Sequence, residues 1–195
     1  MNIILTLTLG LMGMLATSTG FTPKELDLIN GAGTIMRVLT TENQKDIETL
    51  RAKSSELSVE DLNSEAYKRL TRMMLATVTH PSQNGVGIAA PQVGINRRVV
   101  AVQRFDKEGE PFEVYPNIRI VWASKELAPG PEGCLSVPNR RGEVMRSQEI
   151  TIEYTDMTRL HEGDYKIRET IKGFTAVIFQ HEIDHLEGIL YIDRL

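Results

Sequence analysis

The sequence predicts an α+β domain in which short mixed or antiparallel sheets pack around a central helix near the C-terminus. A helix-like apolar pattern comes before residue 80, and several β-branched, partly alternating runs follow it. A second apolar helix pattern, which contains the residues His-Glu-x-x-His, comes close to the end of the chain. The length of 195 residues and the hydrophobic content of 41% are those of one globular domain.

Composition argues against a nucleic-acid partner and excludes an internal disulfide. The formal net charge is −4 and no stretch is rich in Lys or Arg, so a nucleic-acid partner is not expected. The single cysteine, Cys134, cannot form an internal disulfide. It is therefore a small core residue, a reactive thiol or a metal ligand. Composition does not determine the oligomeric state.

The first residues differ from the rest of the chain. Residues 1–20 carry no charge, have an apolar run of signal-peptide length and contain small residues at 16–18, but lack a basic start. They are interpreted as a signal peptide or an apolar extension, with a buried first element or translation from Met36 as alternatives. The run is too short to predict a stable membrane span in the mature protein. Residues 21–35 are predicted to be a linker and 36–195 the main domain.

The first half of this domain is predicted to be largely helical. Residues 36–39 are typical of a short strand, and 43–57 of a helical turn or loop. Ser58 is a candidate N-cap for a helix that continues to about Val78. This helix has a period close to 3.6 residues in its apolar positions, which are Leu62, Ala66, Leu70, Met73, Met74 and Val78.

The second half is predicted to contain mostly strands. A helix follows Gly173, and Gly188 is expected to end it as the residue after the C-cap. The last seven residues, "ILYIDRL", are predicted to form a strand. The β-branched runs that predict the other strands are 97–105, 112–124, 142–156 and 165–173.

The C-terminal helix presents two histidines on an otherwise apolar face. Phe174, Val177, Ile178, His181 and His185 share this face by their spacing. A single histidine there would most often be a satisfied core residue. Two histidines four residues apart, with a glutamate after the first, can instead bind one metal ion.

A catalytic metal site of this type needs a third ligand. Glu187 and Asp193 follow His185 too closely to fold back onto the same ion, so the ligand should come from upstream. Cys134, in the segment "PEGCLSVP", is the candidate. The remaining histidines, His80 and His161, lie in turn-like contexts and are interpreted as surface or structural residues.

A Cys/His/His set leaves one coordination position for water. The metal would lower the pKa of this water and so supply a nucleophile. Glu182, beside a ligand on the helix, could take the proton and pass it to a leaving amine. The mixed sulfur and nitrogen donors suit zinc and several other transition metals.

The segment "NGVGIAAPQVG" lacks the residues of a phosphate-binding loop. Its alternating glycines are typical of a strand whose backbone is approached closely, and a Gly-rich turn is the alternative. Gln92 in this segment is a neutral donor that could polarise a carbonyl group.

Three motifs taken together resemble those of peptide deformylases. They are "GVGIAAPQ", "EGCLS" and "QHEIDHLEG", and the resemblance extends from about Met36 to the C-terminus. It implies an enzyme that removes the N-formyl group from the initiator methionine of new polypeptides and releases formate. The partners would be N-formylmethionyl peptides, and the compartment would be the cytoplasm, although residues 1–20 are also consistent with export.

The resemblance implies a metal site made of Cys134, His181 and His185, with Glu182 as general base and acid. Family members typically bind one Fe²⁺ ion, and Zn²⁺, Ni²⁺ or Co²⁺ can take its place.

The resemblance also implies how the substrate is held. The Gln92 side chain and the Leu135 N–H would stabilise the oxyanion, with Gly87 nearby on the substrate-binding strand. Glu132 would border the methionine pocket, and Arg141 would contact the peptide further along. The rest of the peptide could pair as a strand beside residues 85–88. The apolar residues placed to line the methionine pocket are Val86, Phe174, Val177 and Ile178.

The sequence departs from the family at two places. "TTENQKDIETLR" replaces the Pro-rich opening motif, and the chain stops at "YIDRL" without the C-terminal helix of many members. That helix contributes to ribosome binding in some members, so ribosome contact is in doubt. The alternatives to a deformylase are another metal-dependent amidase or peptidase, and a non-catalytic peptide-binding module. The lack of a downstream third ligand argues against an ordinary zinc protease, and the intact Glu182, Gln92 and three ligands argue against the binding module.

Overall fold

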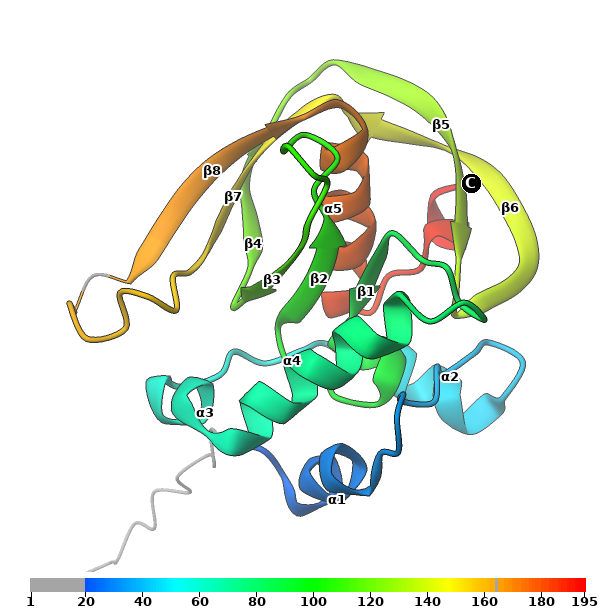
Figure 1. The fold of residues 1–195 in the computed structure, drawn as a ribbon. Helices are drawn as coiled ribbons and strands as arrows, with labels where there is room; N and C mark the ends of the chain where they lie inside the picture. The colour runs from blue at the N-terminus through cyan, green and yellow to red at the C-terminus, as the bar shows by residue number, and fades with distance from the viewer. Residues whose placement is uncertain (1–19, 164) are drawn as a thin grey trace, which may run out of the picture.

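The computed structural model describes residues 20–163 and 165–195 (Figure 1). The apolar segment interpreted as a signal peptide or extension falls almost wholly in residues 1–19, outside the described residues. Within the described ranges, no helix combines the length and the apolar character needed to cross a membrane.

The segment predicted to be a linker contains a helix, α1 (Pro23–Gly31). Thr22 and Glu25 form a capping box, in which each side chain accepts a hydrogen bond from the backbone N–H of the other residue. Glu25 also forms a buried ion pair with Arg97, at 2.9 Å. The capping box starts the helix and the ion pair fixes it to the rest of the domain, so part of the segment predicted to be a linker is a helix.

The helix predicted from Ser58 to Val78 is two helices, α3 (Val59–Asn63) and α4 (Glu65–Val78). Ser58 caps α3 as predicted, but Ser64 ends α3 and its side chain accepts a hydrogen bond from the N–H of Tyr67. A second N-cap six residues after the first therefore divides the helix. The predicted apolar face of α4 is buried in the core.

The sequence predicted two short elements before α3. Residues 43–57 were predicted to be a helical turn or a loop. Within them, Gln44–Leu50 forms the helix α2. Met36–Leu39 is not a strand. Its N–H groups make separate hydrogen bonds, from Met36 to Thr77 Oγ1 and from Leu39 to the Gln92 carbonyl, and no strand ladder forms.

The eight strands of the described part form three antiparallel sheets. The first has the order β1-β2-β3, the second β4-β7-β8, and the third pairs β5 with β6. The strands are β1 (Gly87–Ala89), β2 (Val99–Gln103), β3 (Phe112–Pro116), β4 (Arg119–Ala123), β5 (Leu127–Cys134), β6 (Val137–Ser147), β7 (Glu149–Thr155) and β8 (Lys166–Lys172).

The structure divides two of the predicted β runs. Residues 112–124 form β3 and β4 in different sheets, because Asn117 turns the chain with a φ of 54° and hydrogen-bonds Leu57 through its side chain. Residues 142–156 contribute to β6 and β7. Cys134 is the last residue of the strand β5, which the β-branched runs did not predict and which contains Pro129 and Pro131. A two-stranded sheet has only edge strands, and edge strands tolerate proline.

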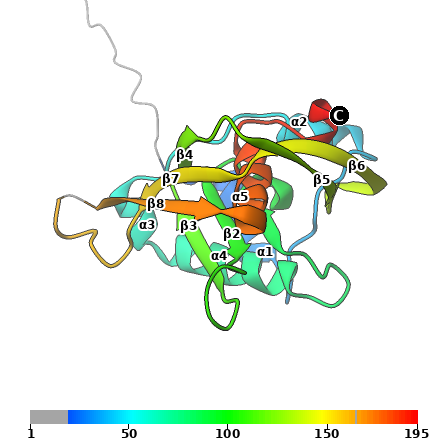
Figure 2. The same ribbon diagram turned by 90° about the horizontal axis from the view of Figure 1, so that it is seen from above.

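The helix α5 (Gly173–Leu186) lies among the three sheets (Figures 1 and 2). Its apolar residues pack on both larger sheets in one core cluster, in which Phe179, Ile183 and Leu186 meet residues of β2 and β7. This arrangement confirms the predicted α+β class with a central C-terminal helix. The last seven residues are not a strand: Tyr191–Arg194 is the 3₁₀ helix η2, capped by a hydrogen bond from the Leu190 N–H to Asp193.

Gly188 ends α5 as predicted, with a φ of +72°. A Cβ atom there would overlap the carbonyl oxygen of Arg51. Gly188→Ala is therefore expected to lower the free energy of unfolding by about 3 kcal/mol, of which about 1 comes from the left-handed backbone and about 2 from the overlap. Gly109→Ala is the matched control, because Gly109 has a φ of +75° and open space around it. Urea denaturation should show the larger loss only for Gly188→Ala; equal losses would contradict the overlap.

Candidate active site

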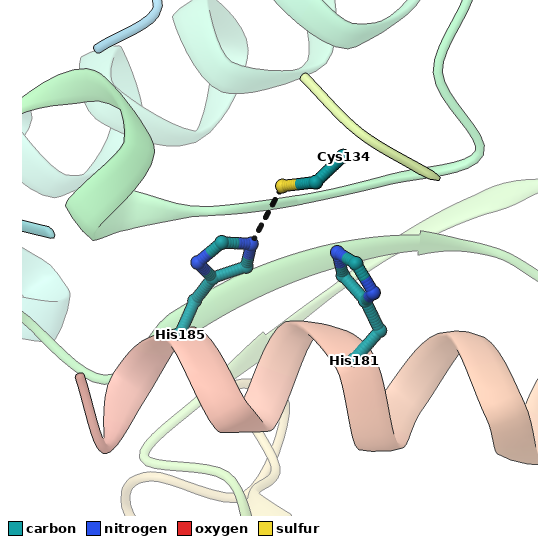
Figure 3. A group of neighbouring side chains, drawn as sticks. All are labelled: Cys134, His181 and His185. Atoms are coloured by element: carbon teal, nitrogen blue, oxygen red, sulfur yellow. Dashed lines mark hydrogen bonds between the residues drawn. The ribbon is translucent and has the colours of Figure 1, made fainter. Parts of the chain in front are cut away.

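The helix α5 aims two histidines at the sulfur of Cys134 (Figure 3). His181 and His185 are one helical turn apart, and their rings lie at a centroid distance of 5.2 Å. The Cys134 Sγ atom is 3.2 Å from His185 Nε2. One ligand atom from each of the three residues lies within 4.8 Å of the others. The structure thus brings together the three residues that the sequence selected as ligands.

Cys134 reaches this position because β5 ends there in an irregularity. The pairing register of β5 with β6 shifts between Gly133 and Cys134, and a tight turn follows. The N–H of Ser136 approaches the Cys134 sulfur at 3.4 Å and holds it at the turn. The sulfur therefore faces α5 rather than the strand beside it.

Glu132 fixes the orientation of His181. Its carboxylate lies 2.7 Å from His181 Nδ1, and Arg146 donates two hydrogen bonds to it. Burial would raise the pKa of Glu132, but the hydrogen bonds from His181 and Arg146 outweigh burial and lower this pKa to about 2. The carboxylate thus engages Nδ1 of His181 and leaves Nε2 free for a cation. Glu132 lines the cleft as expected, but its carboxylate is directed at a ligand rather than at a methionine pocket.

The two histidines differ in their electrostatics. Burial lowers the pKa of His185 well below its usual value, so its imidazole is neutral, as metal binding requires. Burial also acts to lower the pKa of His181, but hydrogen bonds to Cys134 and Glu132 raise it to about 10. A cation must therefore displace a proton from His181, and its affinity should fall as the pH falls.

Glu182 is buried between α5 and β1, with 4% of its surface exposed. Its Oε2 atom has no hydrogen-bond partner within the described part of the chain. Burial raises the pKa of Glu182 to about 7. A Cβ atom on Gly87 would lie 2.5 Å from Glu182 Oε1, so the glycine makes room for the carboxylate. A carboxylate with this pKa can both accept and return a proton near neutral pH.

Gln92 lies on the 3₁₀ helix η1 (Ala90–Val93), which follows β1. Its Oε1 atom accepts a hydrogen bond from the Ala89 N–H at 2.8 Å, and its Nε2 atom donates to Ser136 Oγ at 3.2 Å. The same nitrogen is 3.6 Å from the Cys134 sulfur. These contacts point the amide N–H₂ group toward the ligand cluster, where it can donate to a substrate oxygen.

A cleft of about 820 Å³ opens beside these residues, and a cleft of this size fits a short peptide segment. Phe174 and Val86 expose 57% and 37% of their surface at it, whereas Ile178 is almost buried. Phe174 also packs against Phe105, with ring centroids 5.3 Å apart. The other predicted residues on the cleft wall are Gly87, Gln92, Glu132, Cys134, Leu135, Arg141, Val177, His181 and Glu182. His185 lies behind this wall, with 1% of its surface exposed.

The other predicted histidines and acids do not join the site. His80 contacts Ser82 in a turn, and His161 is exposed in a loop. Glu187 forms an ion pair with Arg98, and Asp193 forms one with Arg51. Glu187 and Asp193 are thus paired elsewhere and are not part of the Cys134, His181 and His185 cluster.

The ligand cluster suits a divalent transition metal. A thiol and two imidazoles are donors that such ions prefer, and together they leave a coordination position open. Glu182 lines the same cleft and its Oε2 atom has no partner among the described residues, so a water molecule beside the ion would have a proton acceptor. The residues present therefore fit a catalytic metal centre.

Sequence reasoning missed three polar residues of the site. Ser136 accepts from Gln92, and Arg146 and Asp184 form an ion pair behind Glu132. Arg146 shares a face of β6 with the buried Val144, where strand alternation predicts an apolar residue. Its charge is stabilised by two carboxylates from other elements, and no local pattern could reveal that. The position of Ser136 in "EGCLS", two residues after Cys134, could have identified it as a residue of the site.

A family model described as Polypeptide deformylase matches residues 35–195. The chain belongs to the polypeptide deformylase family. Peptide deformylase 2 of a Nostoc species is 42% identical over 153 residues, which cover 75% of this chain and 80% of that protein. A Met-Ala-Ser-bound class I type b peptide deformylase from Acinetobacter baumannii is 35% identical, with a TM-score of 0.71 over 84% of this chain and 100% of that one. The peptide deformylase from Thermotoga maritima is 31% identical, with a TM-score of 0.68 over 84% and 99%.

Membership in the deformylase family establishes the reaction class. The enzyme is a hydrolase that acts on an amide, namely the N-formyl group of methionine. The family implies a metal ion, and the Cys134, His181 and His185 cluster is a site for one. The alternatives of a peptidase and of a non-catalytic peptide-binding module are therefore set aside.

Proposed function

We propose that this cleft removes the formyl group from N-formylmethionyl peptides with Glu182 as general base and then general acid. The observation that carries this proposal is the buried Glu182 carboxylate, which has an unpartnered oxygen and a raised pKa beside the Cys/His/His cluster. A base with a pKa near the working pH is the most efficient proton carrier.

Cys134, His181 and His185 would hold the divalent metal, which we propose to be Fe²⁺. Zn²⁺, Ni²⁺ and Co²⁺ suit the same mixed sulfur and nitrogen donors. When bound, the ion supplies Lewis-acid chemistry, since it polarises a carbonyl oxygen and lowers the pKa of water. Metal analysis of protein isolated without oxygen would identify the ion.

The chain's own residues then carry the proton and the charge. Glu182 takes a proton from the water that attacks the formyl carbon, and negative charge develops on the formyl oxygen. The Gln92 amide, whose orientation the Ala89 N–H fixes, and the Leu135 N–H would stabilise this charge. When the C–N bond breaks, Glu182 returns the proton to the leaving amine, and formate and a free methionine amine remain.

The substrate peptide is proposed to lie along β1. This strand is at the edge of its sheet, so its outer backbone groups can pair with a peptide, except the Ala89 N–H, which Gln92 already holds. The methionine side chain would enter the apolar part of the cleft formed by Val86, Phe174, Val177 and Ile178. Arg141, exposed at the cleft, would contact the peptide further along. The related Acinetobacter enzyme is described with Met-Ala-Ser bound.

Formate release from formyl-Met-Ala-Ser by the anaerobically purified, iron-loaded protein tests this function. Acetyl-Met-Ala-Ser is the matched control, because the narrow space beside Gly87 should admit a formyl group and reject a larger acyl group. Rapid formate release with little acetate release supports the proposal. No formate release by protein that has been shown to contain metal would overturn it.

We also propose that residues 36–195 form the catalytic domain and that its partners are N-formylmethionyl peptides.

The position of the mature N-terminus distinguishes the interpretations of the first 35 residues. Sequencing protein from its native cells would show cleavage after residues 16–18, initiation at Met36, or retention of the whole segment.

A further inference from the structure

A series of charged side chains connects the C-terminal 3₁₀ helix to α5. Arg194 in η2 donates two hydrogen bonds to Asp184, from Nε at 2.6 Å and from a terminal nitrogen at 2.5 Å. Asp184 also accepts a hydrogen bond from Arg146 at 2.6 Å. One carboxylate on the ligand-bearing helix is thus shared by two arginines. In Figure 1, η2 is the red segment beside β5 and β6.

The same series continues to a metal ligand. Arg146 donates from Nε to one oxygen of Glu132 at 2.7 Å and from a terminal nitrogen to the other at 3.0 Å. Glu132 in turn lies 2.7 Å from His181 Nδ1. Four consecutive contacts therefore join Arg194 to His181.

The pairing of the two buried carboxylates depends on Arg194. The side chains of Arg146 and Glu132 are 4% and 5% exposed, and that of Asp184 is 11% exposed. Without Arg194, Arg146 would be the only arginine between the two carboxylates, and Asp184 would have to share it with Glu132. A buried carboxylate is costly unless it is well paired, and Arg194 gives Asp184 a second partner. Without it, Arg146 would be drawn toward Asp184 and would hold Glu132 less firmly.

We propose that Arg194 is a positioning residue for the metal ligand His181, acting through the three charged side chains between them. The inference rests on the proposed metal site. The partner of a ligating histidine fixes its tautomer and ring orientation, and loss of such a partner weakens metal binding by about 10- to 100-fold. Since Arg194 acts through intermediates, an effect at the lower end of this range is expected.

A second route from η2 to His181 must be separated from this one. The Tyr191 ring stacks on His181 at a centroid distance of 6.1 Å, so a loosened η2 could also disturb the ligand. Arg51 offers the control, because it forms an ion pair with Asp193 of the same segment, donates to the Gly188 carbonyl after α5, and has no contact with Asp184 among the described interactions. Arg51→Gln loosens η2 and leaves the charged series intact.

The test uses the full chain loaded with Co²⁺, whose visible absorption reports on its ligands. The rate of Co²⁺ loss to a chelator and the absorption spectrum are measured for wild type, Arg194→Gln, Arg194→Lys and Arg51→Gln. We expect about 10-fold faster loss and a shifted spectrum for Arg194→Gln. Arg194→Lys should restore part of the difference because it keeps the cation, and Arg51→Gln should resemble wild type.

Each other outcome overturns the inference. If Arg194→Gln keeps the wild-type rate and spectrum, Arg194 does not position His181. If Arg51→Gln changes both as much as Arg194→Gln, the effect comes from loosening of η2. If wild type does not bind one Co²⁺ with a thiolate absorption band, the metal site of the proposed function has failed, and this result is distinguishable from the first two.

Discussion

Glu182→Gln is expected to reduce kcat for deformylation by about 10²- to 10⁴-fold while the metal content stays at one ion per chain. Glutamine has the same size as glutamate, so it fills the buried space between α5 and β1. It cannot take a proton from water, and the leaving amine would then depart without a general acid. The three proposed ligands do not include Glu182, so metal binding should persist. Formate release and metal analysis on the same preparation measure the two quantities.

Glu187→Gln is the control for this experiment. Glu187 lies at the end of the same helix and pairs with Arg98 at 2.6 Å, away from the cleft. Its replacement changes the net charge by the same amount and should leave turnover within about twofold, because a partly exposed ion pair contributes little. A Glu182→Gln enzyme with wild-type kcat would show that another group carries the proton.

The cluster of Cys134, His181 and His185 could be predicted because each of these residues has a local signature in the sequence. Two histidines at helical spacing share a face whatever the surrounding fold, and Cys134 was the one thiol that could complete the set. The C-terminal helix itself had an apolar periodicity and a glycine in the position that ends it. Here local sequence and tertiary structure agree, as expected where the pattern is long.

The missed elements depend on contacts that no local pattern encodes. "ILYIDRL" has the residues of a strand, but Asp193 caps the Leu190 N–H and the chain coils into η2. The strand β5 contains two prolines, which an edge position permits and a sequence rule rejects. The break at Ser64 had a signal, since a second N-cap residue lies within the predicted helix.

The buried charges of Arg146 and Asp184 form the largest gap in the prediction. Arg146 pairs with Glu132 and Asp184, and Asp184 also pairs with Arg194. All of these partners lie on other elements. A sequence shows the charges but not which of them meet. Only the fold reveals that His181, a proposed metal ligand, is held by a carboxylate that is itself held by an arginine.

Gly87→Ala is expected to lower kcat by about 10²-fold or more without loss of metal. A Cβ atom at this position would lie 2.5 Å from Oε1 of Glu182 and 2.9 Å from both Cδ and Cγ. The added Cβ atom would overlap the methylene carbon as well as the oxygen. The whole Glu182 side chain must therefore rotate away, rather than only its end. A displacement of about 1 Å at a reacting group can cost about 10²-fold in rate. Steady-state formate release, with metal analysis alongside, measures the loss.

Two comparisons show whether the loss comes from Glu182. Gly130→Ala, in β5 of the hairpin that carries Cys134, adds the same methyl group where no atom lies within 4 Å and should keep full activity. In the Glu182→Gln background, adding Gly87→Ala should lower kcat little further, since the group that it displaces has already lost its function. Losses that multiply in the double variant would instead mean that Gly87 acts on the substrate directly, through the free edge of β1.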